Sequence, residues 1–347
     1  MINLYNANIE NLYIHQVGNK CRGEGVFFSQ EPYEISDEIR PLLKEFFLKP
    51  FREKEEQYFK FSEDMPIAHL FVPYNTELHK DIAEHLYNQG THPHIKSGEV
   101  YICQLSNIII DNEKVEGFGI FKSELKSDFL QFEKGTSRLE MNLQQGVNLD
   151  KLDKGALILT DPESKTGFRI LYIDSNKYDS KYWMENFLNL EELEDDHYKT
   201  KKYLKFCEAF ANKVILPAED KQTQMEFIND TYSHFASRDE FIEEEYLGEV
   251  FTEASWIDHP ESFIQEFENF KMLEGPKYSV QDFSDFSISN EMVNECMKKV
   301  KGEINLDTGI SIKVVKGSKA ASTYLEKGWD EDKQMYYYLA YFNKENK

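Results

Sequence analysis

The chain has 347 residues, which is more than one small domain usually holds and predicts two structural units. Its 40% apolar and 14% aromatic residues can fill sizeable cores, which excludes a globally disordered chain. The formal net charge of −23 repels other polyanions and excludes a simple basic DNA-coating protein, so contact with nucleic acid would need a local basic surface.

The beginning of the chain is predicted to combine short strands with two helices. Short strands are expected over residues 9–17 and 25–29. Ser36 is expected to cap a helix that Pro50 closes. A second helix is expected over 76–90, ending at a glycine.

From residue 99 the spacing of apolar residues changes to that of strands. The connections are too short for helical crossovers, so the strands are expected to pair antiparallel, as a meander. The expected strands are 100–110, 117–123, 129–132, 137–144, 156–160 and 168–174.

The second half of the chain is predicted to be helical. The acid run over 191–196 is interpreted as a solvated loop or linker before it. Apolar residues at spacings of three and four then predict helices with short loops between them. The marks of these helices are apolar stripes over 203–214 and 225–235, a capping box at 237–240, and Pro260 in a first turn with Gly275-Pro276 at the end.

The tail returns to β structure, with alternation over 304–315 and an aromatic-rich strand over 334–342. The predicted fold class is therefore α+β. A mostly antiparallel N-terminal sheet with flanking helices is followed by a helical region and a short C-terminal β segment. The expected domains are 1–188 and 189–347.

Motifs for catalysis or metal binding are missing from the sequence. It contains no phosphate-loop, dinucleotide-binding, nucleophile-elbow or zinc-protease pattern. His92-Pro93-His94 offers two imidazoles but no third ligand at a known spacing. The acidic clusters at 191–196 and 243–245 lack the spacing of a calcium loop and are interpreted as solvated faces. No catalytic residue, metal site or cofactor is predicted, and His15 is expected to be a hydrogen-bonded structural histidine.

The sequence also predicts the compartment. The N-terminus lacks a basic stretch followed by an apolar one, so no signal peptide is expected. No apolar run approaches the roughly 20 residues of a membrane span. We therefore expect a cytoplasmic protein with buried, reduced thiols. The four cysteines, none of them in a C-x-x-C pair, are Cys21, Cys103, Cys207 and Cys296.

Basic residues gather after the acid run and in the tail. From Cys296 onward there are 10 Lys/Arg against 7 Asp/Glu, a balance of +3 that leaves −26 for the remainder. Lysines that neutralise phosphates release counterions, so these are candidate DNA contacts. The alternative is that tail lysines only protect an exposed strand edge. The candidate nucleic-acid-binding residues are Lys201, Lys202, Lys205, Lys298, Lys299, Lys301, Lys313, Lys316 and Lys319.

Several stretches, in order along nearly the whole chain, carry a family resemblance. They are 12–17 (LYIHQV), 98–103 (GEVYIC), 116–122 (EGFGIFK), 152–159 (LDKGALIL), 173–188 and 306–312 (LDTGISI). Taken together, the chain resembles the bacterial nucleoid-associated protein family of the NdpA (YejK) type. The resemblance implies a non-enzymatic cytoplasmic protein on the nucleoid that binds double-stranded DNA, with little sequence specificity and no cofactor.

Two other classes of function stay open at this point. The net charge is compatible with an acidic protein-interaction module in genome maintenance or anti-phage defence. Scattered carboxylates in a sheet domain are compatible with a metal-dependent nuclease that uses Mg²⁺. The expected partners are double-stranded DNA and chromosome-associated proteins, without a membrane, and a homodimer is also open.

Overall fold

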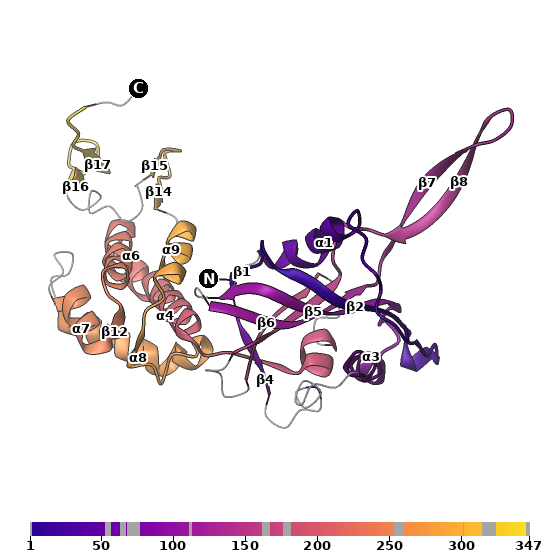
Figure 1. Ribbon diagram of the computed structural model, residues 1–347. Helices are drawn as coiled ribbons and strands as arrows, with labels where there is room; N and C mark the ends of the chain where they lie inside the picture. Colours follow the sequence, from indigo (N-terminus) through magenta and orange to yellow (C-terminus); the bar gives the residue numbers. More distant parts are fainter. Residues whose placement is uncertain are drawn as a thin grey trace. The chain divides into compact units, whose positions relative to one another are not determined.

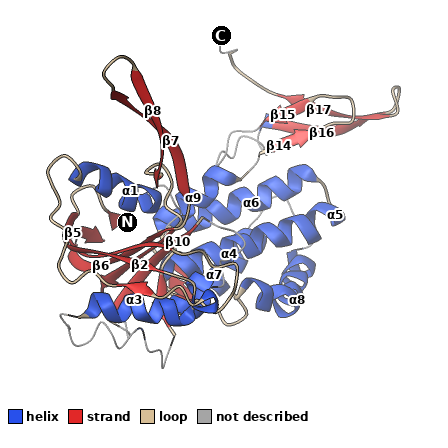
Figure 2. Ribbon diagram, turned by 90° about the vertical axis from the view of Figure 1, so that its right-hand side faces the viewer, coloured by secondary structure: helices blue, strands red, loops and turns tan. Residues whose placement is uncertain are grey.

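The computed structural model describes residues 2–52, 57–62, 67, 77–110, 113–161, 167–175, 182–252, 260–300, 302–313 and 324–344. The chain divides into two units, Met1–Leu193 and Glu194–Lys347. The first unit holds an antiparallel sheet with helices, and the second holds helices followed by short strands (Figures 1 and 2). The α+β class predicted from the sequence is confirmed.

The first unit is built on a sheet in which nine of the described strands pair antiparallel. In spatial order they are β11 (Leu190–Glu192), β4 (Phe59–Phe61), β10 (Phe168–Asp174), β9 (Lys154–Thr160), β6 (Glu113–Ser123), β5 (Gly98–Ile110), β2 (Asn8–Val17) and β3 (Val26–Phe27), with β1 (Ile2–Asn3) on β5. The helical segments of this unit are η1 (Lys20–Arg22), α1 (Arg40–Arg52), α3 (Leu78–Gln89) and the π-helix η2 (Tyr182–Leu188).

Helices cover both faces of this sheet (Figure 1). Successive residues of a strand point to opposite faces, so a strand buried on both sides needs a continuous apolar run. In β5, Val100 and Ile102 pack in the cluster that contains α3 and η2, whereas Tyr101 and Cys103 pack in the cluster that contains α1. This explains why the longest apolar runs of the sequence became the central strands.

Two helices run past prolines that the sequence analysis expects to close them. Helix α1 includes Pro50, and α8 (Pro260–Tyr278) includes Pro276. A proline this close to a helix end removes only one late hydrogen bond, a smaller loss than in a helix interior. In α1 the next residue, Phe51, is buried, and this packing favours the two helical residues that follow the proline.

The meander expected after residue 99 is wrong at one point. Among the described strands, β7 (Lys126–Lys134) and β8 (Leu139–Val147) pair only with each other, and β6 pairs directly with β9. The two strands form a hairpin that extends away from the sheet (Figure 1). Their alternating sequence is that of a sheet strand, so local pattern alone does not separate them from the sheet.

The second unit begins with helices that surround an aromatic core. The core residues include Phe206, Phe210, Phe227 and Phe267. Side chains of Asp195, Asp220 and Ser289 accept backbone N–H groups at the starts of three of these helices. The helical segments are α4 (Asp196–Phe210), η3 (Ala211–Ile215), α5 (Leu216–Ala218), α6 (Lys221–Ala236), α7 (Glu243–Leu247), η4 (Gly248–Thr252), α8 and α9 (Asn290–Lys299).

Strands of the second unit pair as short antiparallel ribbons. The pairs are β12 (Glu240–Ile242) with β13 (Asp285–Ser287), β14 (Glu303–Asn305) with β15 (Ser311–Lys313), and β16 (Leu325–Asp330) with β17 (Met335–Ala340). The last two pairs confirm the C-terminal β segment. The capping box expected at 237–240 is wrong, because Glu240 begins a strand that pairs with β13.

The acid run is not the free linker that its composition indicates. Glu191 and Glu192 belong to β11 at the edge of the sheet, opposite Lys60 and Phe59, and Asp195 caps α4. Among the cysteines, Cys21 is exposed, so the expectation of a buried thiol is wrong there and confirmed for the other three. No helix in the described parts of the chain combines the length and apolarity needed to cross a membrane.

Candidate nucleic-acid interface

The first group of candidate lysines lies on α4. Asp195 accepts the backbone N–H of Tyr198 at 2.8 Å and so fixes the start of this helix. The apolar stripe of α4 faces the core, and Lys205, on the other side, is exposed. Lys201 and Lys202 are half-buried, and the Lys202 ammonium lies 4.7 Å from the centre of the Tyr198 ring.

The second group lies at the end of α9, a helix that packs against α4 (Figure 2). At the start of α9, the Ser289 backbone N–H donates to Thr200 Oγ1 of α4 at 3.0 Å. Lys298 and Lys299 occupy the last turn of α9 and are exposed. Cations are favourable there because helix carbonyls give the C-terminus a partial negative charge.

Helices α4 and α9 contact each other, and Cys296 of α9 lies near two of the α4 lysines. Burial raises the pKa of the Cys296 thiol to about 11 and Glu208 adds to the rise, while the charges of Lys201 and Lys205 oppose it. Both α4 lysines therefore lie within electrostatic range of α9. Lys299 follows Cys296 by three residues, about one helical turn. The candidate lysines, almost 100 positions apart in sequence, thus lie on two helices that contact each other.

We call this region the α4–α9 lysine surface and define it by the charged residues of the two helices. Six lysines oppose four acids, a local balance of +2 in a chain of net charge −23. The lysines are Lys199, Lys201, Lys202, Lys205, Lys298 and Lys299, and the acids are Asp196, Glu208, Glu291 and Glu295. The charged residues of these two helices therefore sum to a positive charge, opposite in sign to that of the whole molecule.

The remaining candidates do not all join this surface. Lys313 is exposed at the end of β15, directly opposite Glu303 of β14, so its charge has a carboxylate as cross-strand neighbour. Lys301, Lys316 and Lys319 lie outside the described residues. The structure therefore brings together the α4 and α9 candidates and leaves Lys313 beside an acid.

Helix α9 is the part of this surface that the sequence analysis missed. The signal was present, because Ser289 stands before an apolar pattern of Met292, Val293 and Cys296, which are all buried. Lys199, also on α4, is not among the candidates of the sequence analysis. When α9 is not predicted as a helix, Lys298 and Lys299 are assigned to the tail and their helix is not recognised as a neighbour of α4.

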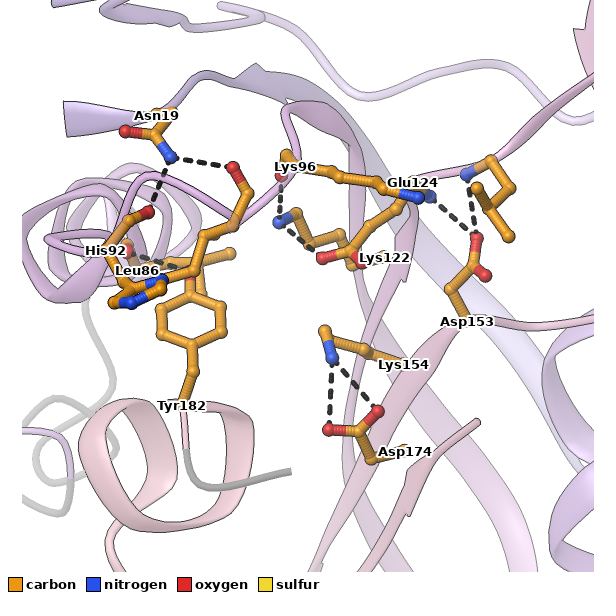
Figure 3. A network of polar contacts seen from close by, with 12 residues as sticks. Asn19, Leu86, His92, Lys96, Lys122, Glu124, Asp153, Lys154, Asp174 and Tyr182 are labelled. Atoms are coloured by element: carbon orange, nitrogen blue, oxygen red, sulfur yellow. Dashed lines mark hydrogen bonds and ion pairs between the residues drawn. The ribbon is translucent and has the colours of Figure 1, made fainter. Parts of the chain in front are cut away.

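A second group of charged residues lies inside the first unit (Figure 3). Lys122 Nζ donates to Glu124 Oε1 at 2.8 Å and to the Lys96 carbonyl oxygen at 2.7 Å. Lys154 Nζ donates to both carboxylate oxygens of Asp174, at 2.9 and 3.0 Å. Burial lowers the pKa of Lys122, and the Glu124 carboxylate opposes this shift. Each ammonium is neutralised by its own carboxylate.

Asp153 completes this buried network. Its Oδ2 accepts the backbone N–H groups of Glu124 at 2.7 Å and Leu125 at 3.0 Å, just before β7 begins. Its Oδ1 is buried without a hydrogen-bond partner among the described residues. These side chains are nine-tenths or more buried, so they join β6, β9 and β10 and offer no surface to a polymeric ligand.

The histidine and carboxylate positions show no ligand set for a metal. His92 and His94 lie in an exposed loop with ring centres 5.1 Å apart. Within the described residues, no three His, Cys, Asp or Glu side chains are grouped so that they could hold a metal ion. His15 is buried and hydrogen-bonded to His79 and Ser29, which confirms the structural interpretation of that histidine.

Comparison with known proteins identifies the family. The model of the family described as nucleoid-associated protein YejK matches residues 14–333. The chain belongs to this family. The match includes most of both units, with the whole α4–α9 lysine surface, and it confirms the resemblance seen in the sequence. No curated protein matches the chain in sequence.

Proposed function

We propose that the chain is a non-enzymatic nucleoid protein that binds double-stranded DNA directly, with little sequence specificity, through the α4–α9 lysine surface. The observation that carries the proposal is the YejK family match over 14–333. The geometry supports it, because α4 and α9 supply a cationic surface on an acidic molecule. A lysine-based contact reads phosphates and not base edges, which is the reason for expecting little specificity.

The same lysines should make the affinity for DNA depend on salt concentration. Each lysine that neutralises a phosphate releases counterions, so affinity falls steeply as salt rises. Exposed lysines at a helix end act as point charges on flexible stems. They do not form the bidentate hydrogen bonds that arginine makes to guanine. The remaining −25 of net charge repels DNA elsewhere and keeps the contact confined to the cationic surface.

The proposal is tested by fluorescence anisotropy of the wild-type protein with two labelled duplexes of unrelated sequence, over a series of salt concentrations. We expect equal affinities for the two duplexes and a linear fall of log K with log salt, with a slope of about −3 or steeper. Failure to bind either duplex at the lowest salt would overturn the proposal.

The acidic protein-interaction module is the competing function, and the −23 net charge favours it. A pull-down from lysate with and without nuclease separates the two. Direct DNA binding predicts that captured proteins disappear when DNA is digested. Partners that persist would favour the module.

For the metal-dependent nuclease the described residues supply no ligand set, and we expect plasmid to stay intact with Mg²⁺ or Mn²⁺.

A further inference from the structure

The β7–β8 hairpin has one apolar face and one polar face. Its register places Leu130 opposite Leu143, Phe132 opposite Met141 and Lys134 opposite Leu139. Since residues of one pair share a face and alternate pairs share it too, five apolar side chains lie on one side. We call them the hairpin stripe: Leu130, Phe132, Leu139, Met141 and Leu143.

The hairpin stripe is open in the isolated chain. Its five side chains are between 53% and 66% exposed, although most large apolar residues of this unit are buried. The other face carries the pairs Gln131–Asn142 and Glu133–Glu140, which are polar. On that face the Phe129 ring covers Gly146, whose absent Cβ would lie 3.0 Å from a ring carbon.

A hairpin of this kind needs a partner on its apolar face. Two strands alone are marginally stable in water, and alternation of apolar and polar residues stabilises a ribbon only when one face is covered. Within the described residues, β7 and β8 pair with no other strand, and none of the stripe belongs to a hydrophobic core cluster. A contiguous exposed stripe of this size is typical of an interaction site.

We propose that the hairpin stripe docks face to face on the same stripe of a second copy of this chain. At about 100 Å² for each large side chain, the stripe offers about 500 Å², so a pair buries about 1,000 Å² from these residues alone, the threshold of a specific interface. A contact between identical patches closes after two copies and forms no fibre.

Charge favours this partner and sets the direction of the contact. The hairpin contains three basic and three acidic residues, so its net charge is zero and two copies meet without the repulsion of the −23 chain. On the stripe face, Asp128 lies at the base and Lys134 at the tip, six residues away, which is about 20 Å along the strand.

A twofold arrangement with antiparallel hairpins satisfies both charges. It places the tip of one copy over the base of the other, so that each Lys134 meets the partner's Asp128 and each Phe132 lies over the partner's Leu130. Gln145 already donates to Asp128 Oδ1 at 2.8 Å, which leaves Oδ2 for the incoming ammonium. Hairpins that met tip to tip would place the two Lys134 ammonium groups together.

Sedimentation velocity of the full chain tests the dimer. The disrupting variant is Phe132→Glu with Met141→Glu, a pair on the stripe face. The matched control is Gln131→Glu with Asn142→Glu, the neighbouring pair on the polar face with the same added charge. We expect dimers for wild type and control, and association weakened at least about 100-fold in the stripe variant. Circular dichroism checks that both variants keep the fold.

Two results would overturn the inference. A wild-type chain that stays monomeric at tens of micromolar would assign the stripe to a different protein. A stripe variant that dimerises like the control would place the interface elsewhere.

Disulfide trapping tests the antiparallel direction, with exposed Cys21 replaced by Ser. Mixing Asp128→Cys chains with Lys134→Cys chains should yield crosslinked heterodimers, and neither variant alone should crosslink. Crosslinking of Lys134→Cys chains on their own would overturn this geometry.

Discussion

At the scale of single residues, the interior of the first unit contains ion pairs whose energy depends on both partners. The side chains of Lys154 and Asp174 are 0% and 3% exposed. Removing water from two charges is costly, and only their mutual attraction and hydrogen bonds offset the loss. The intact pair is therefore needed for β9 to pair with β10, but it adds little net stability to the fold.

Replacement of one partner should consequently cost more than replacement of both. We expect Lys154→Met to lower the free energy of unfolding by about 3–5 kcal/mol, since the buried Asp174 carboxylate loses its Lys154 counter-charge. The double variant Lys154→Met with Asp174→Leu should recover most of this loss. Urea unfolding measures both, followed by Trp183 fluorescence with Trp256 and Trp329 replaced by Phe, because the Trp183 indole donates to the Gly155 carbonyl beside the pair. A loss of about 1 kcal/mol or less in the single variant would contradict this account.

The buried histidine pair gives the first unit a defined pH dependence. Ser29 N–H donates to His15 Nδ1 at 3.1 Å, so His15 carries its proton on Nε2 and donates it to His79 Nδ1, also at 3.1 Å. Burial lowers the pKa of His15 from 6.5 to about 4, and His79 adds to the shift. Burial also lowers the pKa of His79. Both rings are therefore neutral near pH 7.

The sign of the effect follows from proton binding. Between pH 6.5 and about 4, the unfolded chain binds a proton at His15 that the folded chain does not. The free energy of unfolding should fall as pH decreases through this window, by at most about 3 kcal/mol for this residue. Urea unfolding of wild type and His15→Phe at several pH values isolates the contribution of His15. The free energy of unfolding of the variant should fall less steeply as pH decreases. Equal slopes would contradict it.

At the scale of elements, Asp220 joins α6 to the C-terminal ribbon. It accepts the Thr223 backbone N–H at 2.9 Å as helix cap and binds Lys327 of β16 at 2.8 Å. Burial opposes ionisation of this carboxyl, but the bonds from Lys327 and Thr223 outweigh it and hold its pKa below the ordinary value. One side chain thus stabilises a helix start and holds a strand beside it.

Two substitutions separate these roles. Asp220→Asn keeps an oxygen for the cap and loses the charge, so we expect a cost below about 1 kcal/mol. Asp220→Ala loses the cap as well and should cost about 1–2 kcal/mol. Unfolding followed by the fluorescence of Trp329, a residue of β16, reports on this unit when Trp183 and Trp256 are replaced by Phe. If Asn proves as harmful as Ala, the cap is not the main contribution.

Elements with strong periodicity were predictable from sequence, and their partners were not. Strands such as β5 and β9 have apolar runs that only a strand buried on both faces requires, and the stripe of α4 has helical spacing. The β7–β8 hairpin shows the same alternation as a sheet strand, because a pattern records that a face is apolar and not what covers it. The position of Lys205 near α9 depends on packing between distant segments, which local spacing does not encode.

At the scale of the whole molecule, charge decides how an acidic member of the YejK family would meet DNA. The net charge of −23 opposes approach, while the charged residues of the α4–α9 lysine surface sum to +2. A dimer through the hairpin stripe would carry two such surfaces, and linked sites bind one polymer more tightly than a single site does. DNA affinity should therefore depend on where the lysines lie and not on the total charge.

Two charge-matched triple variants test this claim most directly. Lys205, Lys298 and Lys299→Glu changes the surface, and Lys96, Lys114 and Lys151→Glu changes exposed lysines of the first unit by the same charge. In a salt titration of duplex DNA binding, the account predicts that the surface variant weakens affinity at least about 10-fold and makes the salt slope shallower by about 3, while the control stays close to wild type. Equal weakening by both triples, or none by either, would contradict it.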